Sequence, residues 1–356
     1  MARSSDASIQ PVPAALRYVT DAIPGITRRR HGRGFTYRTP DGKTLRDLAE
    51  RRRIAALAIP PAYLNVWICP RPDGHLQATG RDAAGRKQYR YHDAYQQFRQ
   101  QLKYAGLVEF GQALVTIRRR VNRDLKLPGL PREKVLAAAV RLMDLTLIRA
   151  GHGGETGGKP TYGLATLREK HLQRRGHHLR LDFRGKSGQP QRREIDAPAV
   201  AKVLRKCQGL PGHELFRYLD EDGRPHAIDA GDLNDYLVQT ADLGCTAKDF
   251  RTWGGTVLAA CRLASLDRAE SPTARRRQIV ETVKHVASAL GNRPATSRKY
   301  YIHPAVPQAF EDDRLAGYFD GLHRLDPAPA KTQLSRVETA TLQLLRDARP
   351  QRSSRS

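Results

Sequence analysis

The hydrophobic periodicity of the chain changes near residue 93, and this change constrains the fold more than any other feature. Between Gly34 and Tyr91, short alternating runs are separated by the turn sequences Pro40-Asp41-Gly42 and Pro72-Asp73-Gly74. From Tyr95 onward, apolar residues recur at helical spacing instead. We therefore expect an α+β protein, with a small N-terminal antiparallel β-rich domain followed by a larger, mainly α-helical domain.

This division and the local composition predict four segments. We expect an N-terminal extension over residues 1–24, the β-rich domain over 25–95, the helical domain over 96–345 and a basic, disordered tail over 346–356. The 356 residues exceed the roughly 250–300 at which single cores stop growing, which agrees with two domains. The tail carries four arginines and almost no apolar residue, so it can contact a polyanion without folding.

The charge balance points to a polyanionic partner. The chain has 62 Lys and Arg against 36 Asp and Glu, a formal net charge of +26, which is more than solubility needs. Nucleic acid is the first candidate. The charge is spread along the chain and not gathered on one amphipathic helix, and apolar runs such as residues 54–59 are too short to span a bilayer, so we expect no membrane association.

The cysteines give no sign of a metal site or a disulfide framework. Cys69, Cys207, Cys245 and Cys261 stand far apart and form no C-x-x-C pair. We expect them to be reduced and mostly buried, behaving as small hydrophobic residues. We expect neither a metal nor another cofactor.

Two predicted helices end beside polar residues that could do chemistry. Pro131 can open a helix at its first position, and the helix ends near Arg149. Its apolar face consists of Val135, Leu136, Ala139, Leu142 and Met143. A second helix presents Ile279, Val283, Val286 and Leu290 on one face, and Gly291 follows as a C-terminal cap. This arrangement delivers Asn292 at a helix terminus.

A β-hairpin is predicted inside the helical domain. Leu179, Leu181 and Phe183 alternate with polar residues before Gly185-Lys186-Ser187-Gly188, so Lys186 lies at the tip. A last helix is predicted where Ser335 and Glu338 can form a capping box.

Five residues at separated positions point to chemistry on a phosphodiester when they are taken as one set. They are Arg149, Lys186, Arg251, Asn292 and Tyr301. Reversible cleavage needs a nucleophile that stores the bond, donors for the nonbridging oxygens and an acid for the leaving oxygen. A tyrosine hydroxyl, with an ordinary pKa of about 10, requires cationic neighbours, and arginine pairs with phosphate in two places. Singly, each residue is more simply interpreted as a surface or packing residue.

This set, with its flanking sequence, resembles that of the type IB DNA topoisomerases, in the short form found in bacteria and poxviruses, over about residues 25–345. The resemblance implies that Tyr301, which directly precedes Ile302-His303-Pro304, attacks the scissile phosphorus and forms a 3′-phosphotyrosyl link. It implies that Arg149 and Arg251 hold the nonbridging oxygens. Lys186 would protonate the leaving 5′ oxygen, and Asn292 would donate a further hydrogen bond. Supercoils would then be relaxed without ATP or metal.

Residues 80–92 resemble the segment of that family that lies along the DNA. They interleave cations with Gln and Tyr, which suits contacts to phosphates, sugars and base edges. The DNA-binding residues that we predict are Arg81, Arg86, Lys87, Gln88, Tyr89 and Tyr91. The resemblance implies a double-stranded DNA partner and a monomer whose two domains close around the duplex as a clamp. It also implies a cytoplasmic, nucleoid-associated protein.

The chain departs from the resemblance over residues 152–159, which are rich in glycine where relatives carry Asn, Tyr and further charges. We interpret the run 151–158 as a flexible loop with weakened phosphate contacts, followed by a strand from Tyr162 to Leu167. The run misses the spacing of a dinucleotide fingerprint. Gly185-Lys186-Ser187 is not a phosphate loop either, because Arg180 stands where a glycine is required.

Two other functions remain open at this point. A tyrosine recombinase uses similar Arg, Lys and Tyr chemistry, but such enzymes generally place His where this chain has Lys248, three residues before Arg251. A noncatalytic DNA-binding protein could keep the fold, yet all five catalytic positions are filled here. We interpret His303 as a structural or phosphate-side residue.

Overall fold

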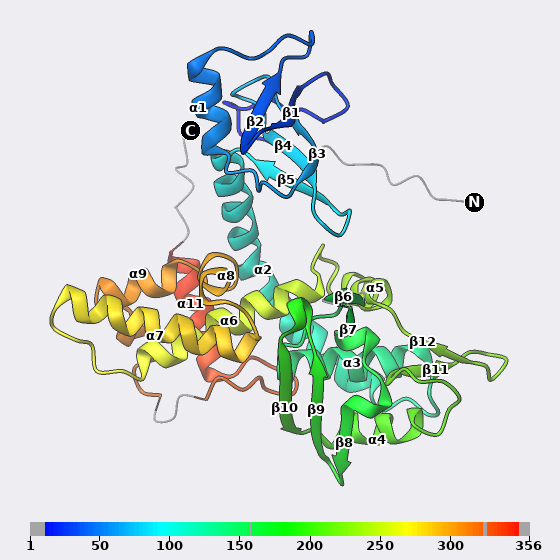
Figure 1. Ribbon diagram of the computed structural model, residues 1–356. Coiled ribbons are helices and arrows are strands. Elements are labelled where there is room, and N and C mark those ends of the chain that lie inside the picture. Colours follow the sequence, from blue (N-terminus) through cyan, green and yellow to red (C-terminus); the bar gives the residue numbers. More distant parts are fainter. Residues whose placement is uncertain (1–10, 152, 157, 323–325, 349–356) are drawn as a thin grey trace, which may run out of the picture. The chain divides into compact units, whose positions relative to one another are not determined.

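The computed structural model describes residues 11–151, 153–156, 158–322 and 326–348. The chain divides into two compact units, residues 1–103 and 104–356, and helix α2 (Asp93–Asp124) belongs to both (Figure 1). The first unit is a β-rich domain and the second is mainly helical, so the predicted α+β class is confirmed.

The first unit contains a five-stranded antiparallel sheet in the order β2-β1-β3-β4-β5. Its elements are β1 (Ile26–His31), β2 (Gly34–Arg38), α1 (Leu48–Ala56), β3 (Leu64–Ile68), β4 (Leu76–Arg81) and β5 (Lys87–Tyr91). The two predicted turns both form: the Gly42 amide donates to the Thr39 carbonyl at 2.9 Å, and the Gly74 amide to the Arg71 carbonyl at 3.3 Å.

A small apolar core and one helix cap hold this unit together. Ile54 from α1 packs with Ile26, Val66, Ile68 and Ala78 from the sheet. The Asp47 carboxylate caps α1, because it accepts hydrogen bonds from the first amides of that helix. Helix α1 therefore covers one face of the sheet.

The second unit is built around one hydrophobic core. Its helices are the C-terminal part of α2, α3 (Arg132–Thr146), α4 (Pro198–Cys207), α5 (Ala230–Ala241), α6 (Ala247–Ala264), α7 (Pro272–Leu290), α8 (Pro294–Tyr300), α9 (Ala305–Glu311), α10 (Leu315–Phe319) and α11 (Arg336–Asp347). The predicted apolar faces of α3 and α7 are buried in this core, which confirms both helices. All four cysteines are buried, as expected.

The predicted β-hairpin is also confirmed. Strands β9 (His178–Arg184) and β10 (Pro190–Asp196) pair antiparallel, and β8 (Leu172–Arg175) extends them to a three-stranded sheet. Helices α3 and α4 pack against this sheet (Figure 1). Lys186 opens the short 3-10 turn η3 (Lys186–Gly188) at the tip.

Two local predictions need correction. The glycine-rich run is not wholly a loop, because β6 (Gly154–Thr156) pairs with β7 (Lys159–Thr161); residues 152 and 157 lie outside the described residues. The stretch after it is not a strand, because Leu164–Thr166 forms the 3-10 helix η1. Glycine favours turn conformations such as the positive φ of +72° at Gly153, so composition alone suggested a loop.

The remaining differences concern helix ends and the C-terminus. Pro131 stands at the N-cap position and α3 begins at the following residue. The capping box of Ser335 and Glu338 forms, and α11 then continues to Asp347, so the first residues of the predicted tail are helical. The rest of that tail, 349–356, lies outside the described residues. A further ladder joins β11 (Arg217–Leu219) to β12 (Pro225–Ala227). Across the described ranges, the helices lack the length and apolarity needed to cross a bilayer.

Candidate active site

Tyr301 directly follows α8, and its backbone lies against α6. The Tyr301 amide donates to the Ser297 carbonyl at 2.9 Å, which ends the helix. On α6, a β-carbon built at Gly255 would come within 2.5 Å of the Tyr301 carbonyl oxygen. Only glycine allows this approach, so Gly255 fixes how closely the tyrosine segment packs on the helix.

Two polar side chains anchor the residues on either side of Tyr301. The Tyr104 hydroxyl donates to the Ile302 carbonyl at 2.9 Å and to the Lys299 carbonyl at 3.1 Å. The His303 amide donates to the Thr256 hydroxyl at 3.1 Å. The His303 ring in turn accepts a hydrogen bond from the Ala305 amide at 3.1 Å, so the described contacts of this histidine are structural. Tyr301 therefore sits in a segment with little backbone freedom.

The guanidinium of Arg251 lies over the ring of Tyr301. Its central carbon is 5.1 Å from the ring centroid, and the side chain is only 3% exposed. Burial, reinforced by the positive charge of Arg149, lowers the pKa of Arg251 to about 10. Arg251 therefore keeps its charge at neutral pH, when it can stabilise a developing anion.

The surroundings of Tyr301 favour its ionised form. Burial alone would raise the pKa of the Tyr301 hydroxyl, but the charge and hydrogen bond of Arg251 and the charges of Arg149 and Lys248 outweigh burial and lower it. Lys248 is exposed on the first turn of α6, three residues before Arg251. The three cations therefore make the Tyr301 hydroxyl more acidic without a neighbouring base.

Arg149 and Asn292 meet although they are 143 residues apart in the sequence, because the Arg149 guanidinium donates to the Asn292 side-chain carbonyl. Each lies just beyond a helix C-terminus: Leu147 closes α3 with φ +55°, and Gly291 closes α7 with φ +60°. The backbone after Arg149 is held by Gly163, whose α-carbon would be 2.5 Å from a β-carbon on Gly151.

Arg251 also ties these two helix ends together. Its guanidinium donates to the Leu147 carbonyl and, at 2.9 Å, to the Leu290 carbonyl. Helix C-termini carry unpaired carbonyls and partial negative charge, which a buried guanidinium satisfies. The structure thus brings Tyr301, Arg251, Arg149 and Asn292 into one cluster.

Lys186 is the one predicted catalytic residue that the described contacts leave outside this cluster. It is exposed, at the tip of the β9–β10 hairpin. Within the described residues its ammonium makes no hydrogen bond or ion pair with another protein group. The backbone after it is left-handed, with φ +59° at Ser187 and +73° at Gly188.

The neighbouring Tyr300 is placed differently from Tyr301. Tyr300 is 42% exposed, and the Lys299 ammonium lies 5.5 Å from its ring centroid. The buried Arg251 guanidinium therefore lies over Tyr301 and not over Tyr300.

The predicted DNA-binding residues gather on the β4–β5 hairpin in the first unit. Tyr89 and Tyr91 are exposed and stack with ring centroids 6.0 Å apart. Asp82 in the turn accepts hydrogen bonds from Arg86 and Gln88, both at 2.9 Å. Of the other cations, Arg81 donates to the Gly85 carbonyl at 2.8 Å and Lys87 forms an ion pair with Asp21.

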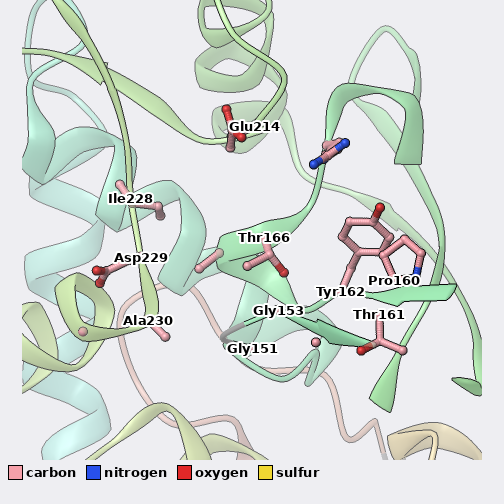
Figure 2. Close-up of a pocket in the computed structure, with 14 residues that line it drawn as sticks. Gly151, Gly153, Pro160, Thr161, Tyr162, Thr166, Glu214, Ile228, Asp229 and Ala230 are labelled. Carbon is pink, nitrogen blue, oxygen red and sulfur yellow. The ribbon is translucent and has the colours of Figure 1, made fainter. Parts of the chain in front are cut away.

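A pocket of about 570 Å³ adjoins the segment that follows Arg149 (Figure 2). Its wall combines glycines of the β6–β7 region with Tyr162, Glu214 and Asp229, which caps α5. None of the five predicted catalytic residues belongs to its described lining. Among the described residues, no group of three or more His, Cys, Asp and Glu side chains could hold a metal ion.

Sequence reasoning missed several residues that build the site. Gly255 and Tyr104 were not singled out, and neither was Arg193 of β10, whose guanidinium donates to the Ala289 carbonyl at 2.7 Å. Adjacent glycines at positions 254 and 255 inside a helical pattern were the available signal, because such glycines usually have a packing reason.

Comparison with known proteins agrees with both parts of the chain. Residues 92–315 match the family model described as eukaryotic DNA topoisomerase I, catalytic core, and residues 34–82 match that of the bacterial DNA topoisomerase IB N-terminal domain. DNA topoisomerase 1B of Acanthamoeba polyphaga mimivirus is 30% identical over 285 residues, covering 78% of this chain and 85% of the relative. DNA topoisomerase 1B of vaccinia virus (strain Copenhagen) is 22% identical over 237 residues, covering 66% of this chain and 72% of the relative.

Most of the first domain and most of the helical domain therefore match models of DNA topoisomerases. More particularly, the chain belongs to the type IB DNA topoisomerase family. This membership decides against the recombinase alternative and agrees with Lys248 at the discriminating position.

Proposed function

We propose that this protein relaxes supercoiled DNA by cleaving one strand of a duplex through Tyr301 and resealing it, without ATP or a metal ion. The observation that carries the proposal is the buried Arg251 guanidinium lying 5.1 Å over the Tyr301 ring. Membership of the type IB family and relatives named DNA topoisomerase 1B support it.

In the cleavage step, a bond forms between the Tyr301 oxygen and the scissile phosphorus while the bond from phosphorus to the 5′ oxygen breaks. The phenol proton leaves to solvent, and the departing 5′ oxygen takes a proton from Lys186. The products are a 3′-phosphotyrosyl link and a free 5′ hydroxyl. Because one phosphodiester replaces another, the reverse reaction reseals the strand without an external energy source.

Donor groups at the cluster fit a phosphate in the site. The side-chain nitrogen of Asn292 and the Nε atom of Arg251 are buried and lack a partner among the described protein groups. Nonbridging oxygens of a bound phosphate would satisfy such donors, whose unmet hydrogen bonds otherwise cost free energy. Arg149 would add a positive charge and a bidentate pair of hydrogen bonds to the same phosphate.

Lys186 would act from the hairpin tip. Its exposure means that the ammonium is free to approach the leaving oxygen once DNA lies in the site, with Gly185 and Gly188 flanking the turn. General acid catalysis of this kind contributes typically 10²- to 10⁴-fold.

We further propose that the β4–β5 hairpin lies along the duplex and that a monomer closes its two domains around the DNA. The net charge of +26 and the exposed Tyr89 and Tyr91 support a DNA partner. In the cell, the proposal places the protein in the cytoplasm, in association with the nucleoid.

Relaxation of supercoiled plasmid in EDTA, without ATP, tests the proposal. We expect activity in the wild type and in Tyr300→Phe, and none in Tyr301→Phe. Loss in Tyr300→Phe alone would transfer the nucleophile to that residue. No relaxation by the wild type at any salt concentration, together with no covalent DNA adduct under denaturing conditions, would favour a noncatalytic DNA-binding protein.

A further inference from the structure

Arg193 of β10 makes hydrogen bonds to three separate parts of the site. Its guanidinium donates to the Thr146 carbonyl at the end of α3, at 3.3 Å, and to the Ala289 carbonyl at the end of α7, at 2.7 Å. It also donates to the Gln191 side-chain carbonyl at 3.0 Å, on its own strand. One side chain thereby joins two helix ends to the hairpin that carries Lys186.

These contacts run parallel to those of Arg251. Arg193 uses the carbonyls of Thr146 and Ala289, and Arg251 uses the carbonyls of the next residues, Leu147 and Leu290. At each helix terminus, two consecutive carbonyls are thus held by two different guanidinium groups. The negative end of each helix dipole favours both cations.

The ends that Arg193 holds are those that deliver the predicted phosphate donors. Arg149 follows Leu147 by two residues and Asn292 follows Leu290 by two, and their side chains bond to each other. A small shift of either helix end would therefore move the pair relative to Tyr301.

Gln191 adds a contact between the hairpin and the Asn292 turn. A β-carbon on Gly291 would meet the Gln191 side-chain nitrogen at 2.2 Å, and one on Gly185 would meet its γ-carbon at 2.9 Å. Gln191 is 6% exposed, so it fills the space between the two turns. Its partner Arg193 keeps it in that position.

We propose that Arg193 is a positioning residue for strand cleavage and resealing, which acts by holding the ends of α3 and α7 so that Arg149 and Asn292 face Tyr301. The inference rests on the proposed function, because it assigns Arg193 a part in that reaction. The described hydrogen bonds of Arg193 reach the two helix ends and its own strand, which is why we assign it a positioning part.

The first experiment measures the single-turnover cleavage rate constant on a linear duplex for Arg193→Ala, Arg193→Lys and Arg192→Ala. Arg192 is the matched control, since it is the next residue on β10 and pairs outward with Asp182 at 3.1 Å with its side chain 63% exposed. We expect Arg193→Ala to slow cleavage and resealing roughly 10- to 100-fold, because misplacement of catalytic groups by about 1 Å can cost 10²-fold. Arg193→Lys should recover part of the loss, and Arg192→Ala should match the wild type.

A rate constant per active molecule separates positioning from general instability, since an unfolded fraction lowers the amplitude of the cleavage reaction and not its rate constant.

A double-mutant cycle with Asn292→Ala sharpens the test. If Arg193 acts through the Arg149–Asn292 pair, Arg193→Ala will cost much less in the Asn292→Ala background than in the wild type. Additive losses would overturn the proposal.

A substrate with sulfur in place of the bridging 5′ oxygen tests whether Arg193 acts through the helix ends or through Lys186 on the hairpin. The phosphorus–sulfur bond breaks to release a thiolate, which needs no proton from Lys186. Lys186→Ala should recover on this substrate, while Arg193→Ala should stay slow. Recovery of Arg193→Ala would mean that it acts through Lys186 instead. If the wild type and Arg192→Ala both fail to cleave, the proposed function itself is wrong.

Discussion

Gly255 and Tyr301 are in backbone contact so close that a β-carbon on Gly255 would lie 2.5 Å from the Tyr301 carbonyl oxygen. Gly255 lies one helical turn after Arg251 on α6, so both residues face the tyrosine segment. The missing side chain at Gly255 lets the Tyr301 backbone approach α6, and the Arg251 guanidinium lies over the Tyr301 ring. This relationship makes Gly255 a sensitive site for substitution.

Gly255→Ala is therefore expected to slow cleavage by about 10²-fold, the loss that a displacement of roughly 1 Å can cause. An alanine would normally favour a helix interior by about 1 kcal/mol over glycine, so the effect is opposite to helix propensity. Single-turnover cleavage measures the rate, and DNA affinity should stay unchanged.

Gly106→Ala in α2 is the matched control. A β-carbon at Gly106 meets nothing within 4 Å, so this variant should cleave at the wild-type rate and unfold at a slightly higher temperature. Wild-type cleavage by Gly255→Ala would show that the backbone contact does not position Tyr301.

The pH dependence of cleavage tests the electrostatics of Tyr301. Burial opposes ionisation, but the charges of Arg251, Arg149 and Lys248 lower the pKa of Tyr301 below its ordinary value. If the Tyr301 phenolate is the nucleophile, as proposed, the cleavage rate should rise with pH and level off below pH of about 10, the ordinary tyrosine pKa. Lys248→Gln removes one of the charges, so the pKa of Tyr301 should rise and the rising limb should move to higher pH.

Lys284→Gln provides the control for that shift. Lys284 is exposed on α7 and pairs with Glu281 at 2.7 Å. Its replacement by Gln changes the net charge by the same amount as Lys248→Gln. The limb of this variant should coincide with that of the wild type. Because Lys248 is exposed, its effect should also shrink at high salt. An identical limb in all three proteins at low salt would refute the proposed role of Lys248.

Local signals in the sequence were sufficient for the elements that carry the site. The apolar spacing of α7 and the glycine after it predicted that Asn292 follows a helix end, and alternation before Gly185 predicted the hairpin of Lys186. Both are confirmed because each depends on residues a few positions apart. The catalytic roles of the five residues stay predictions.

Contacts between distant segments were not predictable in this way. The Arg149–Asn292 hydrogen bond spans 143 residues, and the Tyr104 contact with Ile302 spans 198. Neither leaves a periodic signal in the sequence, because packing and not spacing brings the partners together. The pairing of β6 with β7 is local and was missed for a different reason: its glycines adopt positive φ angles, and composition alone favours such a segment as a loop.

Asp82→Asn should strengthen DNA binding, although Asp82 itself is not one of the predicted DNA contacts. The Asp82 carboxylate holds Arg86 and Gln88 at 2.9 Å, and phosphates would have to displace it. Asparagine keeps one acceptor oxygen for the turn amides of Ala84 and Arg86 but loses the charge. We expect several-fold higher affinity and a log–log salt slope steeper by up to about 0.9, the value for one more neutralised phosphate.

Fluorescence anisotropy with a labelled duplex measures this effect, in a Tyr301→Phe background that prevents cleavage. Asp41→Asn is the control, because Asp41 pairs with Lys43 at 3.0 Å in a turn that holds none of the predicted DNA contacts. Equal gains from both variants would mean that net charge alone is responsible, and the β4–β5 hairpin would lose its special role.

Glu338→Gln should destabilise the helical unit by about 3 kcal/mol, because it breaks a buried ionic network. The Arg118 guanidinium, 1% exposed, donates to Glu338 at 2.7 and 2.8 Å and to Asp144 at 2.9 and 3.1 Å. Trp253 also donates to Glu338, at 3.0 Å. These contacts link α2, α3, α6 and α11, and a neutral amide would leave part of the charge on Arg118 unpaired.

Urea denaturation gives the free energy of unfolding for this comparison. Glu281→Gln is the control, since Glu281 is 53% exposed and its ion pair with Lys284 is screened by solvent. We expect that variant to unfold within about 0.5 kcal/mol of the wild type, as surface substitutions usually do. If Glu338→Gln were no more destabilising than Glu281→Gln, the network would contribute little to stability, and the docking of α11 would depend on its buried apolar residues instead.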